Sequence, residues 1–177
     1  MPHRALLVLV LVAAAAAPAR ALPGRGAALP PVQVDDVAAG RARPLPDRHP
    51  VLVMYEDKNA QSQNVRARAV LGRINDRAEN RARFEFVAVA DVAEYDWWPA
   101  KHYVLDDLKK VAKRENTPLF ADWKAALRKQ WGTRAHKSVL VLAGSDGRVL
   151  FAGEGTLSDA QIAALVAELK ALGCDVD

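Results

Sequence analysis

The chain has 177 residues, of which 51% are hydrophobic and 26% are charged. This composition suits one globular domain and argues against a disordered chain or a membrane bundle. The formal net charge of +4 is too small to indicate nucleic-acid binding by itself. Cys174 is the single cysteine of the sequence, which excludes an intramolecular disulfide, a cysteine-based zinc site and a dithiol active site within one chain.

The N-terminal segment has the pattern of a secretory signal peptide. Arg4 supplies a positive charge, residues 5–17 are uncharged and apolar, and Ala19-Arg20-Ala21 matches the A-x-A pattern before a cleavage site. A retained membrane anchor is the alternative, but the apolar run is shorter than the roughly 20 residues that a membrane span needs. We therefore expect cleavage after Ala21, a periplasmic or secreted mature protein, and no stable membrane association.

The first part of the mature chain is predicted to be a leader followed by one buried strand. Residues 22–31 are rich in Gly, Pro and Ala and indicate a flexible linker. Val32-Gln33-Val34 is typical of a short edge strand, and the proline-rich segment 35–50 of turns. The apolar run 51–55 indicates a strand that is buried on both faces.

Helices and strands then alternate. Ser62 is a plausible N-cap of a helix to about Asn80, with an apolar stripe along it, and residues 84–90 form the next expected strand. A second helix is expected to start at Asp96–Pro99 and to end before Pro118. Residues 119–121 form a short strand candidate, and Asp122 is a candidate cap for a helix that closes at Gly132.

The last third of the chain gives the clearest pattern. Two apolar runs, 138–142 and 148–152, flank a Gly-Ser-Asp-Gly turn and predict an antiparallel hairpin. Ser158 and Gln161 form a capping box before a helix that Gly173 ends. The element order predicts an α/β fold with parallel strands joined by helices and an antiparallel hairpin at the end.

This order resembles the thioredoxin fold, in particular its redoxin branch of alkyl hydroperoxide reductase and thiol-specific antioxidant relatives. The resemblance rests on the strand 51–55 feeding a helix, on Trp131-Gly132-Thr133-Arg134 before the strand at 138, and on Asp146-Gly147-Arg148-Val149 in the hairpin. Among such groups the chain is similar to exported, cysteine-poor bacterial proteins of the YtfJ type. The resemblance implies a three-layer sandwich with a mixed central sheet over residues 32–173, with residues 174–177 as a tail.

The chemistry of this family requires residues that the sequence lacks. A Cys-x-x-Cys at the start of the first central helix would fall at Ala60-Gln61-Ser62-Gln63, where neither sulfur is present. The family's buried acid would fall at Met54. Its cis-proline, which faces the dithiol and presents a backbone edge to substrate, would fall at Lys137, between His136 and Ser138. These departures together indicate that thiol redox chemistry was not kept.

Other polar candidates each have a simpler interpretation. Ser62 is a candidate nucleophile but fits a helix cap better, and the adjacent acids Glu56 and Asp57 fit solvated surface better than a ligand site. His102 and Asp106 lie one helical turn apart without the further ligands of a metal site. His136 is a candidate ligand contact, because its loop would face residues 60–63 in this fold.

The aromatic and basic clusters leave two alternatives open. Tyr95, Trp97, Trp98 and Tyr103 are expected to cover the core, and the alternative is an exposed patch that docks a partner. The arginines of the helix after residue 62 indicate a solvated face. Cys174 is expected to be an incidental free thiol, or else to pair with another chain.

The sequence thus predicts an exported, redox-inactive thioredoxin-fold protein with a binding, regulatory or structural role in the periplasm. No catalytic residue, cofactor or metal is expected, and the expected partner is a periplasmic protein rather than nucleic acid. The alternative, which the fold resemblance alone would suggest, is a thiol-dependent oxidoreductase or antioxidant enzyme.

Overall fold

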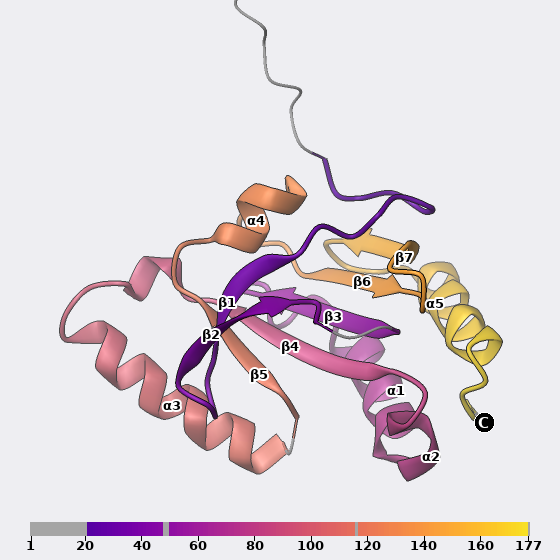
Figure 1. Cartoon of the computed structure of the whole chain (residues 1–177), viewed down its shortest axis with the longest axis horizontal. Coiled ribbons are helices and arrows are strands. Elements are labelled where there is room, and N and C mark those ends of the chain that lie inside the picture. Colours follow the sequence, from indigo (N-terminus) through magenta and orange to yellow (C-terminus); the bar gives the residue numbers. More distant parts are fainter. Residues whose placement is uncertain (1–20, 48–49, 116, 177) are drawn as a thin grey trace, which may run out of the picture.

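The structure is a computed structural model and describes residues 21–47, 50–115 and 117–176. Apart from Ala21, the predicted signal segment lies outside these residues. The strands of the described chain form one sheet in the order β2-β1-β5-β4-β3-β6-β7 (Figure 1). The strands are β1 (Val32–Asp36), β2 (Arg41–Leu45), β3 (Val51–Glu56), β4 (Glu85–Asp91), β5 (Leu119–Asp122), β6 (Val139–Ala143) and β7 (Val149–Glu154). The helices are α1 (Val65–Asp76), α2 (Ala78–Arg81), α3 (Ala100–Glu115), α4 (Ala126–Trp131) and α5 (Asp159–Ala171), with a 3₁₀ turn η1 (Ala93–Tyr95).

The sheet is mixed, as the sequence predicted. β3, β4 and β5 run parallel to one another, while β1 with β2, β1 with β5, β3 with β6, and β6 with β7 are antiparallel. Helical segments connect the parallel strands, because a strand can pair in parallel with its successor only after a crossover. The predicted α/β class with a C-terminal hairpin and helix is therefore confirmed.

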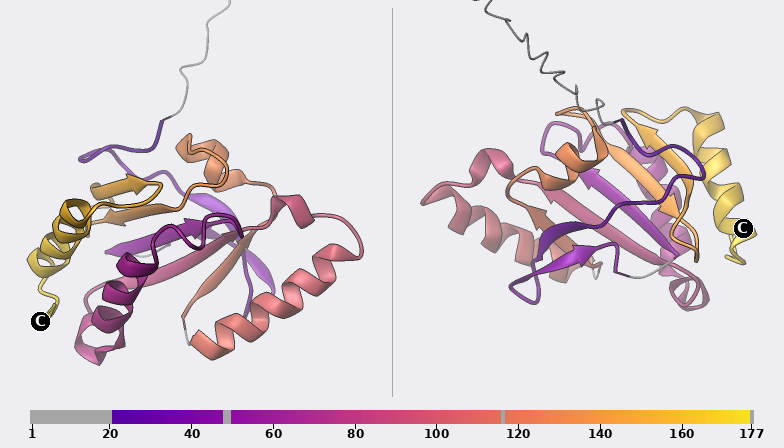
Figure 2. Two further views of the ribbon diagram at one scale, coloured as in Figure 1. Left: turned by 180° about the vertical axis from the view of Figure 1, so that it is seen from behind. Right: turned by 45° about the horizontal axis from the view of Figure 1, so that its top comes forward.

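Helices cover both faces of the sheet and give three layers (Figure 2). Alternate residues of β3 point to opposite faces: Val53 and Tyr55 pack with the α4 residue Trp131, whereas Leu52 packs with residues of α1 and α5 such as Leu71. The apolar side of α3 packs with Ala121 and other residues next to the end of β5. Burial on both faces explains why β3 reads as a continuous apolar run.

The N-terminal part of the domain differs from the sequence prediction. The segment 32–34 was expected to be an edge strand, but β1 pairs with both β2 and β5, and β2 is the edge. The segment 35–50 was expected to contain only turns, but it contains β2. Pro44 obscured this strand in the sequence, although an edge strand tolerates a proline because one side of its backbone faces no partner.

The leader segment 22–31 is attached to the sheet, whereas we expected a flexible linker. Ala28 forms an isolated antiparallel bridge with Arg148, and the Gly26 N–H donates to the Val149 carbonyl over 2.8 Å. The Arg148 guanidinium donates to the Gly26 carbonyl over 2.8 Å. These contacts cover the beginning of β7, which would otherwise present an unpaired strand edge.

The helix predicted from Ser62 to about Asn80 begins later and is divided. α1 starts at Val65, and the extended backbone of Arg77 separates it from α2. The predicted apolar stripe was Val65, Ala69, Ile74 and Ala78, whereas the buried residues of α1 are Ala67, Leu71 and Ile74, and Val65 is exposed. The capping box of α5, in contrast, is present as predicted.

Asp36 closes the β1–β2 hairpin, and its charge makes the stability of this hairpin depend on pH. Its Oδ1 accepts the N–H groups of Ala38 and Ala39 over 3.0 and 2.9 Å, and its Oδ2 pairs with Arg43 over 3.2 Å. Burial by itself would raise the pKa of Asp36, but the backbone N–H groups and the Arg43 guanidinium outweigh it and hold this pKa below its usual value.

We predict that Asp36→Ala lowers the free energy of unfolding by about 1 kcal/mol at neutral pH. Because the pKa is lower in the folded state, the charged carboxylate stabilises the fold above about pH 4, and this contribution disappears as pH falls through the lowered value. Urea unfolding between pH 2 and 7 should show the difference between wild type and Asp36→Ala shrinking in acid. Asp36→Asn, which retains an acceptor for the turn, should lose less. A difference that is constant over this range would contradict the prediction.

Candidate functional site

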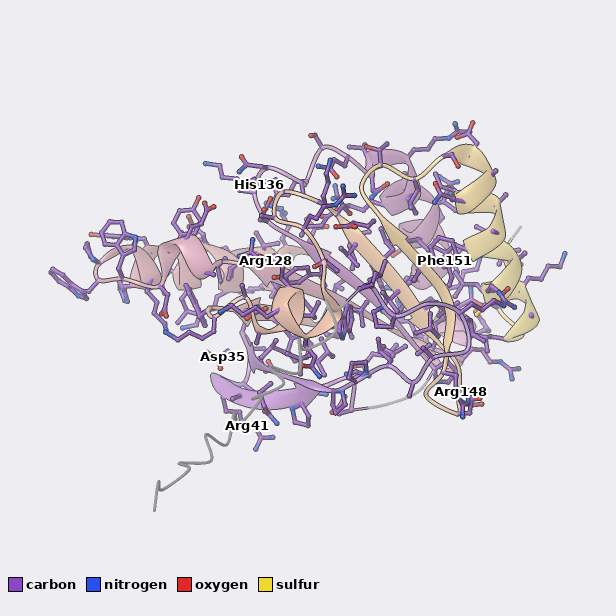
Figure 3. The ribbon with its side chains drawn as sticks, turned by 90° about the horizontal axis from the view of Figure 1, so that it is seen from above. Asp35, Arg41, Arg128, His136, Arg148 and Phe151 are labelled. Carbon is purple, nitrogen blue, oxygen red and sulfur yellow. The ribbon has the colours of Figure 1, made fainter. Side chains whose placement is uncertain are left out.

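Several loops meet at one edge of the sheet, which we call the carboxyl edge because β3, β4 and β5 end there. β6 begins at the same edge, since Val139 pairs with Tyr55 near the end of β3. Two segments face each other there: the turn (residues 57–64), which follows β3, and the facing loop (residues 133–138), which precedes β6. Figure 3 shows His136 of the facing loop at this edge. The structure thus brings the predicted residues 60–63 and 136–138 together.

Asp57 holds His136 against the turn. Its Oδ2 accepts the backbone N–H of His136 over 2.8 Å and lies 2.8 Å from Nδ1 of the ring. Its Oδ1 accepts the N–H groups of Asn59 and Ala60, both over 2.9 Å. His136 has a φ of +61°, a conformation that is costly for a residue with a Cβ and that these bonds maintain.

Nδ1 of His136 lies 2.8 Å from Asp57 Oδ2 and 3.1 Å from Asn59 Nδ2, so this ring nitrogen is held against the turn. Nε2 is the other ring nitrogen of this half-exposed side chain and is the one that a bound group can contact. Among the described residues, no group of three or more His, Cys, Asp or Glu side chains is arranged so that it could hold a metal ion.

Gln63 joins the turn to the backbone of the facing loop. Its Nε2 donates to the His136 carbonyl over 2.7 Å, and its Oε1 accepts the Ser138 N–H over 3.1 Å. Both polar ends of one carboxamide are therefore used by two backbone groups that flank Lys137.

Asn64 links the start of α1 to two other segments, the facing loop and the segment after β7. Its Nδ2 donates to Ser138 Oγ and to the Gly155 carbonyl, both over 2.8 Å, and its Oδ1 accepts the Leu157 N–H over 2.9 Å. Gly155 has a φ of +81°, which favours glycine at this position. Asn64 is only 2% exposed, so these bonds form away from water, where an unpaired polar group is costly.

Glu56 completes the network from the end of β3. Its Oε1 accepts the hydroxyl of Ser138 over 2.7 Å, and its Oε2 pairs with Arg68 over 2.6 Å. We expected Glu56 and Asp57 to be solvated surface, and this expectation is wrong: their side chains are only 11% and 13% exposed. Each carboxylate is instead occupied by donors from other segments of the chain.

The remaining residues of the turn have simpler roles. Ala60 is buried, whereas Gln61 and Ser62 are exposed. Ser62 is not the N-cap of α1, because the helix starts at Val65 and Asn64 takes that position. Asn64 does not cap the helix with its side chain, since that side chain is committed to the network.

A buried polar group lies at the same edge under α4. The Tyr55 hydroxyl donates to Asp122 Oδ2 over 3.4 Å, and the same carboxylate accepts the N–H groups of Ala126 and Leu127 over 2.8 and 2.9 Å. Burial, followed by the nearby carboxylates of Asp91 and Asp122, raises the pKa of Tyr55 far above its usual range. The phenol of Tyr55 therefore stays neutral, and its ring packs in the core beside Trp131. The N-cap residue of α4 is Ala125 and not Asp122 as predicted, because the helix begins later than expected, although the Asp122 carboxylate still accepts the N–H groups of the first two helical residues.

Cys174 lies at the opposite edge of the sheet. β7 ends at the carboxyl edge, and α5 runs back from there to Cys174. The next residue, Asp175, donates its N–H to Asn80 Oδ1 over 2.8 Å, and Asn80 lies just before the start of β4. The thiol packs with the core residues between α1 and α5. Burial raises its pKa, which the nearby Arg83 only partly offsets. The single sulfhydryl is thus remote from the turn and largely un-ionised.

The aromatic cluster is exposed, contrary to our expectation that it covers the core. Trp97, Trp98 and Tyr103 are 60%, 87% and 66% exposed, whereas Tyr95 is partly buried against the α3 side of the sheet. Trp97 and Trp98 lie between β4 and α3, and therefore at the carboxyl edge. His102 and Asp106 form an exposed pair at 3.5 Å on α3.

Sequence reasoning missed Asn64, the central residue of the network. An asparagine just before an apolar helical stripe suggests an N-cap, and nothing in its neighbourhood indicates contacts with residues more than 70 positions away. Ser138 was assigned to the loop that corresponds to the cis-proline region, but its bonds to Glu56 and Asn64 were not foreseen.

We predict that Asn64→Ala lowers the free energy of unfolding by about 2–3 kcal/mol, because it leaves the Leu157 N–H and the Gly155 carbonyl unpaired in a buried site. Asn59→Ala is the matched control: Asn59 is an exposed residue of the same turn, whose Nδ2 lies 3.1 Å from His136 Nδ1, and its loss should cost well under about 1 kcal/mol. Urea unfolding of the two variants tests this, and equal losses would contradict the role assigned to Asn64.

Comparisons with known proteins found no matching family and no similar curated protein. Several solved structures share the fold. A thiol peroxidase from Chromobacterium violaceum has a TM-score of 0.63 at 13% identity, covering 86% of this chain and 89% of its own. A putative thiol:disulfide interchange protein DsbE from Chlorobium tepidum has a TM-score of 0.59 at 17% identity, covering 85% and 98%. The peroxidoxin BcpB from Mycobacterium tuberculosis gives 0.59 at 17%, covering 85% and 97%.

Likeness at such identities shows the fold and no more. The described chain has a thioredoxin-like redoxin fold, and it places paired polar side chains at the turn where the sequence resemblance expects sulfur.

Proposed function

We propose that this chain is an exported, redox-inactive protein of the thioredoxin-like fold that has a binding role in the periplasm. The observation that carries the proposal is the use of the turn: Asp57, Gln63 and Asn64 are all bonded to the facing loop or to the segment after β7. A thiolate nucleophile needs a sulfur at a helix start, where the N–H groups lower its pKa. The turn offers amides, a carboxylate and a hydroxyl instead.

Cys174 does not substitute for the missing sulfur. It is buried at the far edge of the sheet, and its raised pKa keeps the thiol un-ionised at neutral pH. Only the thiolate is a good nucleophile, so Cys174 is poorly suited to peroxide reduction or disulfide exchange.

Export is supported by the sequence of the N-terminal segment. The positive Arg4, the apolar residues 5–17 and the small residues before position 22 match the three regions of a cleaved signal peptide. Across the part of the chain that the structure describes, no helix combines the length and the apolarity that crossing a bilayer requires. Within this proposal the chain corresponds to the exported, cysteine-poor YtfJ type.

The exposed aromatic residues offer the binding surface. Trp97, Trp98 and Tyr103 leave most of their ring area in water, and together they expose roughly 400 Å² if each ring presents an area typical of large aromatic side chains. Exposed apolar area of this order is often functional in a soluble protein, and Trp and Tyr are enriched among the residues that dominate interface energies. A stable homodimer needs about 800 Å² from each partner, so this patch alone favours a smaller, transient contact with another protein.

We predict that the purified protein shows no thiol-dependent turnover. In insulin-reduction and peroxide-consumption assays, wild type and Cys174→Ser should both match the rate without protein. Native Cys174 should also react slowly with an aromatic disulfide reagent, and rapidly after unfolding in urea, because burial both shields it and raises its pKa. Turnover that is lost in Cys174→Ser would support the oxidoreductase alternative and overturn the redox-inactive assignment.

We predict that the Trp97→Ala/Trp98→Ala double variant loses its crosslinked partner in periplasmic extracts while keeping its melting temperature within a few degrees. Val65→Ala is the control, because Val65 is also an exposed apolar residue but lies on α1. It should retain the same crosslinked species as wild type. Recovery of that species by wild type and the double variant in equal yield would contradict a binding role for the aromatic patch.

A further inference from the structure

A small cavity lies between the second half of α1 and the C-terminal tail, which Figure 2 shows beside this helix. Its volume is about 140 Å³. Four of its lining residues are spaced three or four positions apart and so belong to one side of α1 and of the helix break after it, while the fifth comes from the tail. The lining residues are Val70, Arg73, Ile74, Arg77 and Val176. The cavity thus combines apolar side chains with two guanidinium groups.

The tail side of the cavity is fixed by Asn80, which is only 1% exposed. Its Oδ1 accepts the Asp175 N–H over 2.8 Å, and its Nδ2 donates to the Asp175 carbonyl over 2.7 Å. The Asp175 carboxylate pairs with Arg77. These bonds hold the next residue, Val176, against α1, where it packs on the core. The cavity therefore has walls on both sides.

Arg73 supplies the positive charge that is available to a ligand. It is exposed in the last turn of α1, and within residues 21–47, 50–115 and 117–176 its guanidinium makes no hydrogen bond or ion pair. Arg77, in contrast, is already paired with Asp175. A guanidinium presents a fork of N–H groups that matches a carboxylate, and it binds this group in a bidentate manner. The charge at the cavity mouth therefore favours an organic anion.

The apolar lining and the volume define the rest of the ligand. Val70, Ile74 and Val176 offer hydrocarbon surface. An apolar protein cavity of about 150 Å³ holds a benzene ring. A body of about six carbon atoms therefore fits this cavity, whereas a large cofactor does not.

We propose that this cavity binds a small organic carboxylate. The carboxylate pairs with Arg73, and the apolar body lies between α1 and Val176. This site goes beyond the proposed function, because it shares no residue with the carboxyl edge or with the aromatic patch. The same chemistry is available from a free acid or from the C-terminal residue of a polypeptide.

Ligand binding at this cavity is coupled to Cys174. The thiol is buried in the core between α1 and α5 and belongs to the same tail as Val176. A reagent reaches it only when the tail moves away from α1. A ligand that contacts both α1 and Val176 stabilises the closed tail and slows this opening.

The first test titrates sodium benzoate into the full mature chain at constant ionic strength and follows amide chemical shifts by NMR. Wild type should bind with a Kd of about 1 mM or tighter, as expected for a ligand of this size. Arg73→Gln should bind about tenfold more weakly, because a charged hydrogen-bonded pair is lost. Arg66→Gln is the matched control: Arg66 is an exposed arginine of α1 outside the cavity, and this variant should bind like wild type.

The second test measures the reaction of Cys174 with a neutral maleimide. For a Kd of about 1 mM, benzoate at about 5 mM should slow this reaction about sixfold in wild type. Benzamide, which has the same ring without the charge, should slow it far less. The protection by benzoate should largely disappear in Arg73→Gln and persist in Arg66→Gln.

A third arm compares benzoate with the tripeptide Gly-Gly-Leu, whose terminal carboxylate lies beside an apolar side chain. Tighter binding of benzoate would assign the site to a free acid, and tighter binding of the tripeptide to the end of a polypeptide. Both results support the proposed chemistry.

Equal affinity of wild type and Arg73→Gln for benzoate would overturn the proposal. Equal protection of Cys174 by benzoate and benzamide would overturn it too, as would a reaction rate that benzoate leaves unchanged. These two comparisons use wild type alone, so they decide the question even if Arg73→Gln does not fold. The redox assays and the Trp97/Trp98 experiment do not depend on these outcomes.

Discussion

The buried carboxamide of Asn64 is the interaction on which the carboxyl edge depends. It links the start of α1 to Ser138 of the facing loop and to Gly155 and Leu157 of the segment after β7, two segments that the order of the strands brings together. In a buried site each of these bonds is worth more than at the surface, because the alternative is a polar group without water. Glu56, Asp57 and Gln63 then add bonds at the rim of the same joint. The result is a cross-link made of polar side chains.

This cross-link changes what the fold can do. A helix start at the end of a parallel strand is a good place to stabilise a negative charge, and a thiolate there would be activated. In this chain the start of α1 follows an asparagine whose side chain is turned into the network, and the single thiol lies buried at the other edge. The fold is shared with solved structures of a thiol peroxidase and a peroxidoxin. In this chain, hydrogen bonds between polar side chains hold the start of α1 to the neighbouring segments. The indoles of Trp97 and Trp98 are exposed in the loop before α3, which is the surface that we propose contacts a partner.

Features that depend on residues close together in the sequence were predicted correctly, whereas features that depend on contacts between distant segments were not. The continuous apolar run of β3, the hairpin of β6 and β7, and the capping box of α5 depend on neighbours in the sequence and were found correctly. β2 was missed because Pro44 and Gly40 are turn signals, and only its pairing with β1 identifies it as a strand. The residues 60–63 and 136–138 were placed opposite each other by resemblance to a family. The bonds between them, and the burial of Asn64, depend on packing between distant segments and leave no local pattern. The exposure of the tryptophans was also missed, because a large aromatic side chain is buried in most proteins.

The central claim is that the carboxyl edge is closed by the chain's own buried polar groups. Native-state hydrogen exchange of the Gly155 and Leu157 amides tests it most directly, since their acceptors are the Ser138 carbonyl and Asn64 Oδ1 and neither amide belongs to a helix or a strand. The account predicts that both amides exchange as slowly as those of the central strand β3, which open only on global unfolding. Exchange at the rate of an exposed loop would contradict it.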